Sequence, residues 1–157
     1  AFYTGDKSYE ILGYLLKDLD GEGVEELLIG ENAADGSGPD TGWDSIIYDM
    51  FAIRGGELVH IFDGWERNRY YLCENGAVAN EGSSGAAYSS WEFFTYKNGE
   101  LKLIESVFTD EDAQFQSHWY HSDKPSYEDK SNEITADAGN QILEKYVYQK
   151  LNFTPFQ

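Results

Sequence analysis

Residues 94–104 read FTYKNGELKLI, and residues 51–61 repeat the same pattern as FAIRGGELVHI. Each stretch has an apolar run, a basic residue, a two-residue turn that ends in glycine, and a second apolar run. Asn-Gly and Gly-Gly are the dipeptides that type I′ hairpin turns favour, because both central residues need a positive φ. Between the two stretches, Asn75-Gly76 follows a third strand-like run. Three hairpins in sequence predict an antiparallel meander.

Two stretches rich in Gly, Ser, Asp and Asn, Glu31–Asp44 and Ala79–Ser90, interrupt the strand-like runs, and we expect both to be long loops. A threonine suited to cap a helix opens the stretch Thr135–Tyr148, where apolar residues recur at a spacing of four and predict an amphipathic helix. Residues 151–156 are expected to run extended and to pack aromatic rings on the core. We therefore expect residues 1–157 to form a single domain that is mainly β (α+β): an antiparallel meander or curled sheet with one C-terminal helix packed against it.

The stretch DLDGEGVEE, residues 18–26, has the composition of a calcium-binding loop. Carboxylates occupy its positions one, three, five and nine, namely Asp18, Asp20, Glu22 and Glu26. A glycine stands at position six, where such loops turn sharply, and Val24 at position seven can offer its carbonyl oxygen. Position twelve is Ile29 rather than a bidentate Glu, so the loop is not an EF-hand, and the apolar runs on both sides predict a strand–loop–strand unit. The alternative is a plain acidic turn that uses Asp and Gly for their turn chemistry.

The charge of the chain limits its partners. Its 29 acidic and 11 basic residues give a formal net charge of −18. Phosphate recognition depends on Lys and Arg, so we expect neither a nucleic-acid partner nor an anionic membrane. No apolar stretch reaches the length of a membrane span, and no membrane insertion by this segment is expected. The excess of carboxylates suits a divalent cation, although a merely well-solvated surface explains it equally well.

Four tryptophans in a small acidic domain suggest a carbohydrate-binding face, because aromatic rings stack on the apolar side of pyranose rings. The candidate ligand-binding residues are Trp43, Trp65, Trp91 and Trp119. The alternative for each ring is ordinary packing in the core of a sheet.

No catalytic constellation stands out in the sequence. The run 82–85, Gly-Ser-Ser-Gly, lacks the spacing of a nucleophile elbow. His118 and His121 could form a transition-metal pair, but in an extended segment side chains three apart point in different directions. Cys73 lies in a strand-like run, so a buried structural thiol is expected rather than a nucleophile.

The loop 18–26 followed by Leu-Leu-Ile resembles the Asp-rich FG-GAP type of calcium repeat, here in a single copy. The wider chain, through residues 62–67, 71–76 and 79–85 to the closing 154–156, is similar to an uncharacterised β-rich domain of cell-surface lipoproteins of gut Firmicutes. This resemblance implies an extracellular location on the bacterial surface, within a larger or lipid-anchored protein. It carries no assigned activity.

Together these patterns lead us to expect a non-catalytic module that binds Ca²⁺ and that takes a carbohydrate or a surface protein as its ligand. The metal ligands would be Asp18, Asp20, Glu22, Val24 and Glu26. Two alternatives remain open: a glycan-active enzyme domain, which needs two carboxylates across a cleft, and a purely structural spacer.

Overall fold

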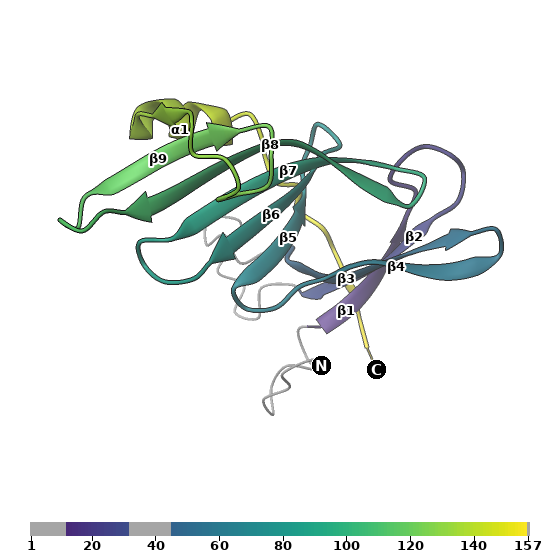
Figure 1. Cartoon of the computed structure of the whole chain (residues 1–157). Helices are drawn as coiled ribbons and strands as arrows, with labels where there is room; N and C mark the ends of the chain where they lie inside the picture. The colour runs from purple at the N-terminus through teal and green to yellow at the C-terminus, as the bar shows by residue number, and fades with distance from the viewer. Residues whose placement is uncertain (1–11, 32–44, 157) are drawn as a thin grey trace.

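The computed structural model describes residues 12–31 and 45–156 (Figure 1). Within this part of the chain the protein is mainly β, with one antiparallel sheet and a single C-terminal helix, which confirms the expected fold class. No helix in the described residues is long and apolar enough to cross a membrane.

The described residues form eleven strands and one helix, in the following order along the chain. The strands are β1 (Leu12–Lys17), β2 (Glu26–Glu31), β3 (Ile47–Arg54), β4 (Glu57–Asp63), β5 (Asn68–Leu72), β6 (Val78–Ser83), β7 (Ser89–Lys97), β8 (Glu100–Glu111), β9 (Ser117–Ser122), β10 (Glu133–Ile134) and β11 (Thr154–Pro155), and helix α1 (Ala136–Leu143) lies between the last two.

Sequential strands pair with one another, as expected of a meander, and the order across the sheet is β10-β9-β8-β7-β6-β5-β3-β2-β1-β11. β4 pairs with its sequential neighbour β3 but lies off this path, and the two pairings in the described residues that are not sequential are β3–β5 and β1–β11. β3 pairs with β2 along one edge, and its other edge is shared by β4 and, at the single pair Ile47–Tyr70, by β5. The sheet therefore branches at β3.

The hairpin turns have the conformations that their dipeptides predict. Gly55 and Gly56 both have positive φ, 57° and 80°, between β3 and β4. Asn98 and Gly99, between β7 and β8, also have positive φ, 54° and 77°. At the third turn only Gly76 has a positive φ, of 84°, so this connection is a longer turn closed by a left-handed glycine.

The expectation of a long loop over Ala79–Ser90 was wrong. Most of this stretch is strand, since β6 runs to Ser83 and β7 begins at Ser89. Two of its small residues reflect close packing: Ala79 is fully buried, and a Cβ at Gly82 would come within 2.6 Å of the Ser90 hydroxyl oxygen. Other small residues, such as Ser84 and Ala86, are exposed in the turn between β6 and β7.

Helix α1 begins where the sequence predicts and ends earlier than expected. The Thr135 hydroxyl accepts the N–H of Ala138 at 3.1 Å, as an N-cap does. The helix ends at Leu143 rather than at Tyr148, because the following segment pairs with the end of β5: Tyr148 forms a β-bridge with Cys73, and the Gln149 N–H donates to the Leu72 carbonyl. Tertiary hydrogen bonds override the helical periodicity there.

The central strands β5, β6 and β7 contribute to a core cluster on each of their two faces. One face contributes to a core cluster that includes Leu72 and Val78 and is completed by residues of β2, β3 and β4. The other face carries Tyr71 and Phe93 and is covered by α1 and the segment after it. Figure 1 shows α1 lying over β8 and β9, with the C-terminal segment running back across the sheet toward β1.

The C-terminal segment completes the first core cluster. Leu151 and Phe153 are buried in it, and β11 then pairs with β1. Two glycines allow this close approach, because a Cβ at Gly13 would overlap the Thr154 backbone and one at Gly30 would overlap the Phe153 ring. The expected packing of the tail's aromatic rings on the core is thus found for Phe153 but not for Phe156, which is 45% exposed.

We expect Gly30→Ala to destabilise the protein by about 2–3 kcal/mol, because the added methyl would overlap both the Phe153 ring and the Ile46 carbonyl oxygen. The matched control is Gly55→Ala, where φ is positive but the space is open, so only the backbone strain of about 1 kcal/mol applies. Urea unfolding measures both free energies. Equal losses in the two variants would contradict the close packing of Phe153 on β2.

Candidate metal centre

The candidate loop connects β1 to β2, which confirms the strand–loop–strand arrangement. Asp18 directly follows β1, and its carboxylate organises the loop: its Oδ1 accepts the N–H of Gly21 and its Oδ2 the N–H of Gly23, both at 2.8 Å. Gly21 and Gly23 have positive φ, 74° and 86°, a conformation that favours glycine. The two glycines allow the loop to wrap around the carboxylate.

The other two carboxylates fix the loop to a distant turn. Asp20 Oδ2 accepts the backbone N–H of Asn98, in the β7–β8 turn, at 2.7 Å. Glu26 opens β2 and is buried; its Oε1 accepts the hydroxyl of Tyr96 at 2.9 Å and its Oε2 the N–H of Leu19 at 2.9 Å. These bonds hold the acidic loop against the end of the β7–β8 hairpin.

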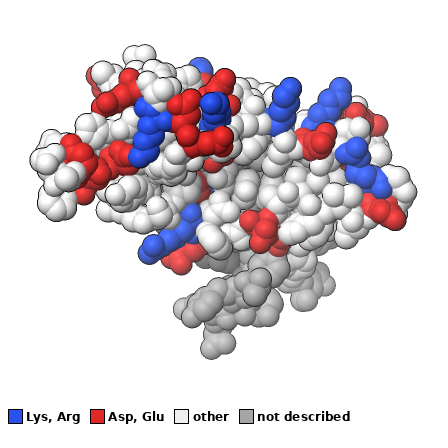
Figure 2. All heavy atoms as spheres, viewed as in Figure 1, with Lys and Arg blue, Asp and Glu red and all other residues white. Residues whose placement is uncertain are grey.

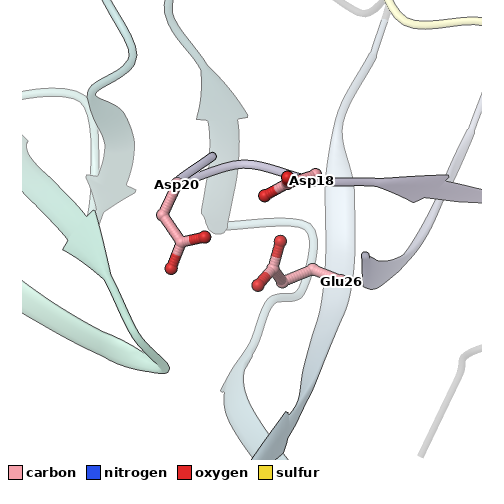
Figure 3. Close-up of side chains that lie close together, drawn as sticks. All are labelled: Asp18, Asp20 and Glu26. Atoms are coloured by element: carbon pink, nitrogen blue, oxygen red, sulfur yellow. The ribbon is translucent and has the colours of Figure 1, made fainter. Parts of the chain in front are cut away.

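Asp18, Asp20 and Glu26 converge, with one oxygen of each lying within 4.8 Å of the others. Figure 3 shows the three carboxylates pointing toward one another from the loop and from the start of β2. Asp18 and Asp20 are half-buried and Glu26 is buried. Like charges this close repel one another in a partly desolvated site.

Hydrogen bonds keep Asp20 ionised in spite of this crowding. Burial acts to raise the pKa of its carboxyl, but the N–H donors of Asn98 and Glu22 outweigh burial and hold the pKa below its ordinary value. Each carboxylate oxygen has two lone pairs, so an oxygen that accepts one N–H still has a lone pair for a cation. The hydrogen bonds within the loop are therefore compatible with a metal ligand role and also with a plain acidic turn.

Glu22 and Val24 are not part of the convergent group. Both are exposed, and both line a cavity of about 130 Å³ that also borders Asp20, Glu26 and Tyr96. Of the four carboxylates expected to bind the metal, the structure brings three together and leaves Glu22 outside the group. Val24, expected to bind through its carbonyl oxygen, lines the cavity beside them.

The tryptophans that the sequence suggests as a sugar-binding face lie in different environments. Trp65 is 65% exposed, in the turn between β4 and β5. Trp91 and Trp119 are half-buried on neighbouring parts of the sheet and stack on one another with ring centroids 5.6 Å apart. Trp119 also contacts Gly139 of α1. Trp43 and the rest of the expected loop over 32–44 lie outside the described residues.

The two histidines of β9 do not share a metal site. His118 hydrogen-bonds to Asp112 and Glu133, at 2.9 and 2.6 Å, whereas His121 hydrogen-bonds to Glu105 at 2.8 Å. Their separation of three along a strand places them on opposite faces, as the sequence predicts.

Cys73 has the character of a structural thiol. It is fully buried in the cluster under the C-terminal segment, and burial raises its pKa to about 11. A thiol that resists ionisation is a poor nucleophile, in agreement with the expectation from sequence.

Two residues that contact the acidic loop, Tyr96 and Asn98, were not predicted from the sequence. Tyr96 donates to Glu26 and accepts the N–H of Gly99 at 3.2 Å, and burial with the Glu26 hydrogen bond raises its pKa. Tyr96 lies 70 positions along the chain from Glu26, and Asn98 lies 78 positions from Asp20, so local spacing gave no signal for them.

Comparison with models of protein families, with curated proteins and with solved structures gave no match to this chain.

We expect Tyr96→Phe to destabilise the protein by about 1–2 kcal/mol in the absence of metal, because it removes a hydrogen bond to the buried carboxylate of Glu26. Tyr14→Phe, at an exposed tyrosine of β1, is the matched control and should change little. Urea unfolding in the presence of chelator measures both variants. Equal stability of Tyr96→Phe and the parent protein would show that this hydrogen bond contributes nothing.

We expect part of the stability to be lost as the pH rises. Hydrogen bonds to Asp112 and then to Glu133 raise the pKa of His118 to about 9. Protonated His118 stabilises the folded state because its pKa is higher there than in the unfolded chain. This stabilisation is complete below the pKa of the unfolded chain, about 6.5, and disappears as the pH rises past 9. Denaturant midpoints at pH 6.5, 8 and 10 test this expectation. His118→Gln should flatten the profile, and an unchanged slope would contradict it; His60→Gln, at an exposed histidine of β4, is the control.

Proposed function

We propose that this chain is a non-catalytic calcium-binding module in which Ca²⁺ ties the β1–β2 loop to the β7–β8 turn, and which binds a carbohydrate or a surface-protein ligand. The observation that carries the calcium proposal is the convergence of Asp18, Asp20 and Glu26, with oxygens within 4.8 Å of one another. A divalent cation between them would convert their mutual repulsion into attraction.

The chemistry of the donors favours Ca²⁺ over Mg²⁺. Ca²⁺ accepts six to eight oxygens at about 2.3–2.6 Å in a flexible shell, whereas Mg²⁺ needs a near-octahedral shell at about 2.0–2.1 Å. Side chains of unequal length on an irregular loop suit the flexible shell. Three carboxylates leave the remaining coordination positions of the ion to water or to backbone carbonyls. The sequence suggests the Val24 carbonyl for one of them, and Val24 lines the same cavity.

The location follows from the family resemblance and remains part of the proposal. Extracellular calcium modules bind with dissociation constants of about 10⁻⁴–10⁻³ M, which suits a site with few protein ligands and a supply of calcium outside the cell. A module of a bacterial surface lipoprotein would therefore be loaded where it works.

The rival functions differ in what they require. A spacer needs no calcium, and the Asp18 turn would then serve only its own backbone. A glycosidase needs two carboxylates across a cleft. Glu66 and Glu81 do line a second cavity, but Glu81 is engaged by the Tyr148 hydroxyl at 2.6 Å and Glu66 is exposed on a turn, so we favour binding over hydrolysis.

We expect calcium to raise the melting temperature. At a concentration one hundred times the dissociation constant, binding adds about 2.7 kcal/mol, or roughly 5–10 °C for a domain of this size. Asp20→Asn should abolish the gain, since it removes the charge from one of the three converging carboxylates. Glu25→Gln, an exposed neighbour outside the convergent group, is the matched control and should keep the gain.

Melting curves recorded with increasing metal concentration also distinguish Ca²⁺ from Mg²⁺ and show which carboxylates bind the ion. Chelator should reverse the shift, and Mg²⁺ at equal concentration should produce a smaller one. Glu22→Gln should retain most of the gain, because Glu22 lies outside the convergent group. Terbium luminescence sensitised through Tyr96 gives a direct readout of occupancy, since its hydroxyl contacts Glu26. A melting curve indifferent to calcium, together with no sensitised emission, would leave only the plain acidic turn.

A further inference from the structure

A second cavity, of about 390 Å³, lies on the face of β5, β6 and β7 that α1 partly covers, and it shares no lining residue with the cavity beside the acidic loop. Its volume falls in the range of small-molecule sites, about 300–1,000 Å³. It is lined chiefly by Arg67, Arg69, Glu81, Ser83, Ser89 and Trp91.

The strand register explains why these side chains meet. Arg69 is paired with Glu81, and Glu81 with Trp91, so a guanidinium, a carboxylate and an indole stand in one row across three strands. Residues directly opposite one another in an antiparallel pair project from the same face.

A second row lies beside the first. Its members are Arg67, whose carbonyl accepts the Ser83 N–H at 3.1 Å, then Ser83 itself and its partner Ser89. Ser83 and Ser89 lie two residues from Glu81 and Trp91 on their strands and therefore share a face with them. Arg67 lies in the turn before β5 and lines the same cavity. The cavity floor thus combines one aromatic ring with charged and hydroxyl groups.

The arginines of the chain gather at this cavity. The net charge is −18, yet two of the three arginines, Arg67 and Arg69, line it, together with Glu66 and Glu81. Basic and acidic side chains are also interspersed on the face seen in Figure 2. Arg69 donates to the Glu66 carbonyl at 2.8 Å, and Glu81 accepts the Tyr148 hydroxyl. In the described part of the chain, the Arg67 guanidinium forms no hydrogen bond or ion pair.

We propose that this cavity binds a pyranose that carries a carboxylate, such as a hexuronic acid unit of a polysaccharide. The Arg67 guanidinium binds the carboxylate through paired N–H donors, and Trp91 contacts the apolar face of the ring. Ser83, Ser89 and Glu81 are placed to hydrogen-bond the hydroxyl groups. This inference rests on the ligand-binding part of the proposed function and does not depend on the calcium site.

The test is calorimetric titration of the protein with trigalacturonic acid in the presence of chelator, with Trp emission as a second readout, because free Ca²⁺ would itself bind the carboxylates of the ligand. Its methyl ester, which keeps the rings and loses the charge, and neutral galactotriose are the ligand controls. We expect binding of the acid only, reduced about tenfold or more by Arg67→Gln. Trp91→Phe should weaken it by a smaller factor. Lys102→Gln, the same charge change at an exposed position of β8, should leave it unaltered.

Each remaining outcome is decisive. The proposal is overturned if the protein binds neither trigalacturonic acid nor sialyllactose, which carries a different acidic sugar. It is also overturned if the protein binds trigalacturonic acid and its methyl ester equally well. Binding of acetate with the same dependence on Arg67 would reduce the site to a simple anion site and overturn the role of Trp91. Release of reducing ends during the titration would overturn binding without catalysis. The calcium-induced melting shift, measured on the same protein without chelator, reports the metal proposal separately.

Discussion

A buried carboxylate links two parts of the sheet that do not pair. Glu26 begins β2 and is 4% exposed, and it reaches the hydroxyl of Tyr96 on β7, although β3, β5 and β6 separate these strands in the sheet. The hydrogen bond between Asp20 and the Asn98 N–H lies beside it. The curl of the sheet brings these groups together, and the core cluster that includes Leu28 and Val78 fills the space it encloses.

The carboxylate that stabilises the curled sheet is also one that could bind a cation. An ionised group excluded from water needs hydrogen-bond donors or a cation, and Glu26 has donors from Tyr96 and Leu19. The Asp18 carboxylate accepts N–H groups of its own loop. A cation in the site would therefore act on the same contact that closes the curl. β7 contributes a side chain beside each polar site: Tyr96 at the acidic loop and Trp91 at the arginine cavity.

The sequence predicts what depends on neighbouring residues. The glycine dipeptides determine the hairpin turns because φ is a local quantity, and the Asp18 turn follows from its own glycines. The sequence misleads where distant contacts decide: Ala79 and Gly82 pack against neighbouring strands rather than in a loop, and Tyr148 leaves the helical pattern to pair with Cys73. Tyr96 could not be predicted as part of the acidic site, because 70 residues separate it from Glu26 in the sequence.

The pairing of β11 with β1 has a consequence for how the chain folds. The hairpins β3–β4 and β7–β8 close over short loops, whereas Leu151 donates to the Ser45 hydroxyl across 106 residues and Phe153 fills the first cluster only from the end of the chain. Loop closure over such a distance is entropically expensive and slow. The hairpins can therefore form early, but this core cannot be sealed until the last strand arrives, so during synthesis the apolar face of β1–β3 stays accessible until residue 153 has left the ribosome.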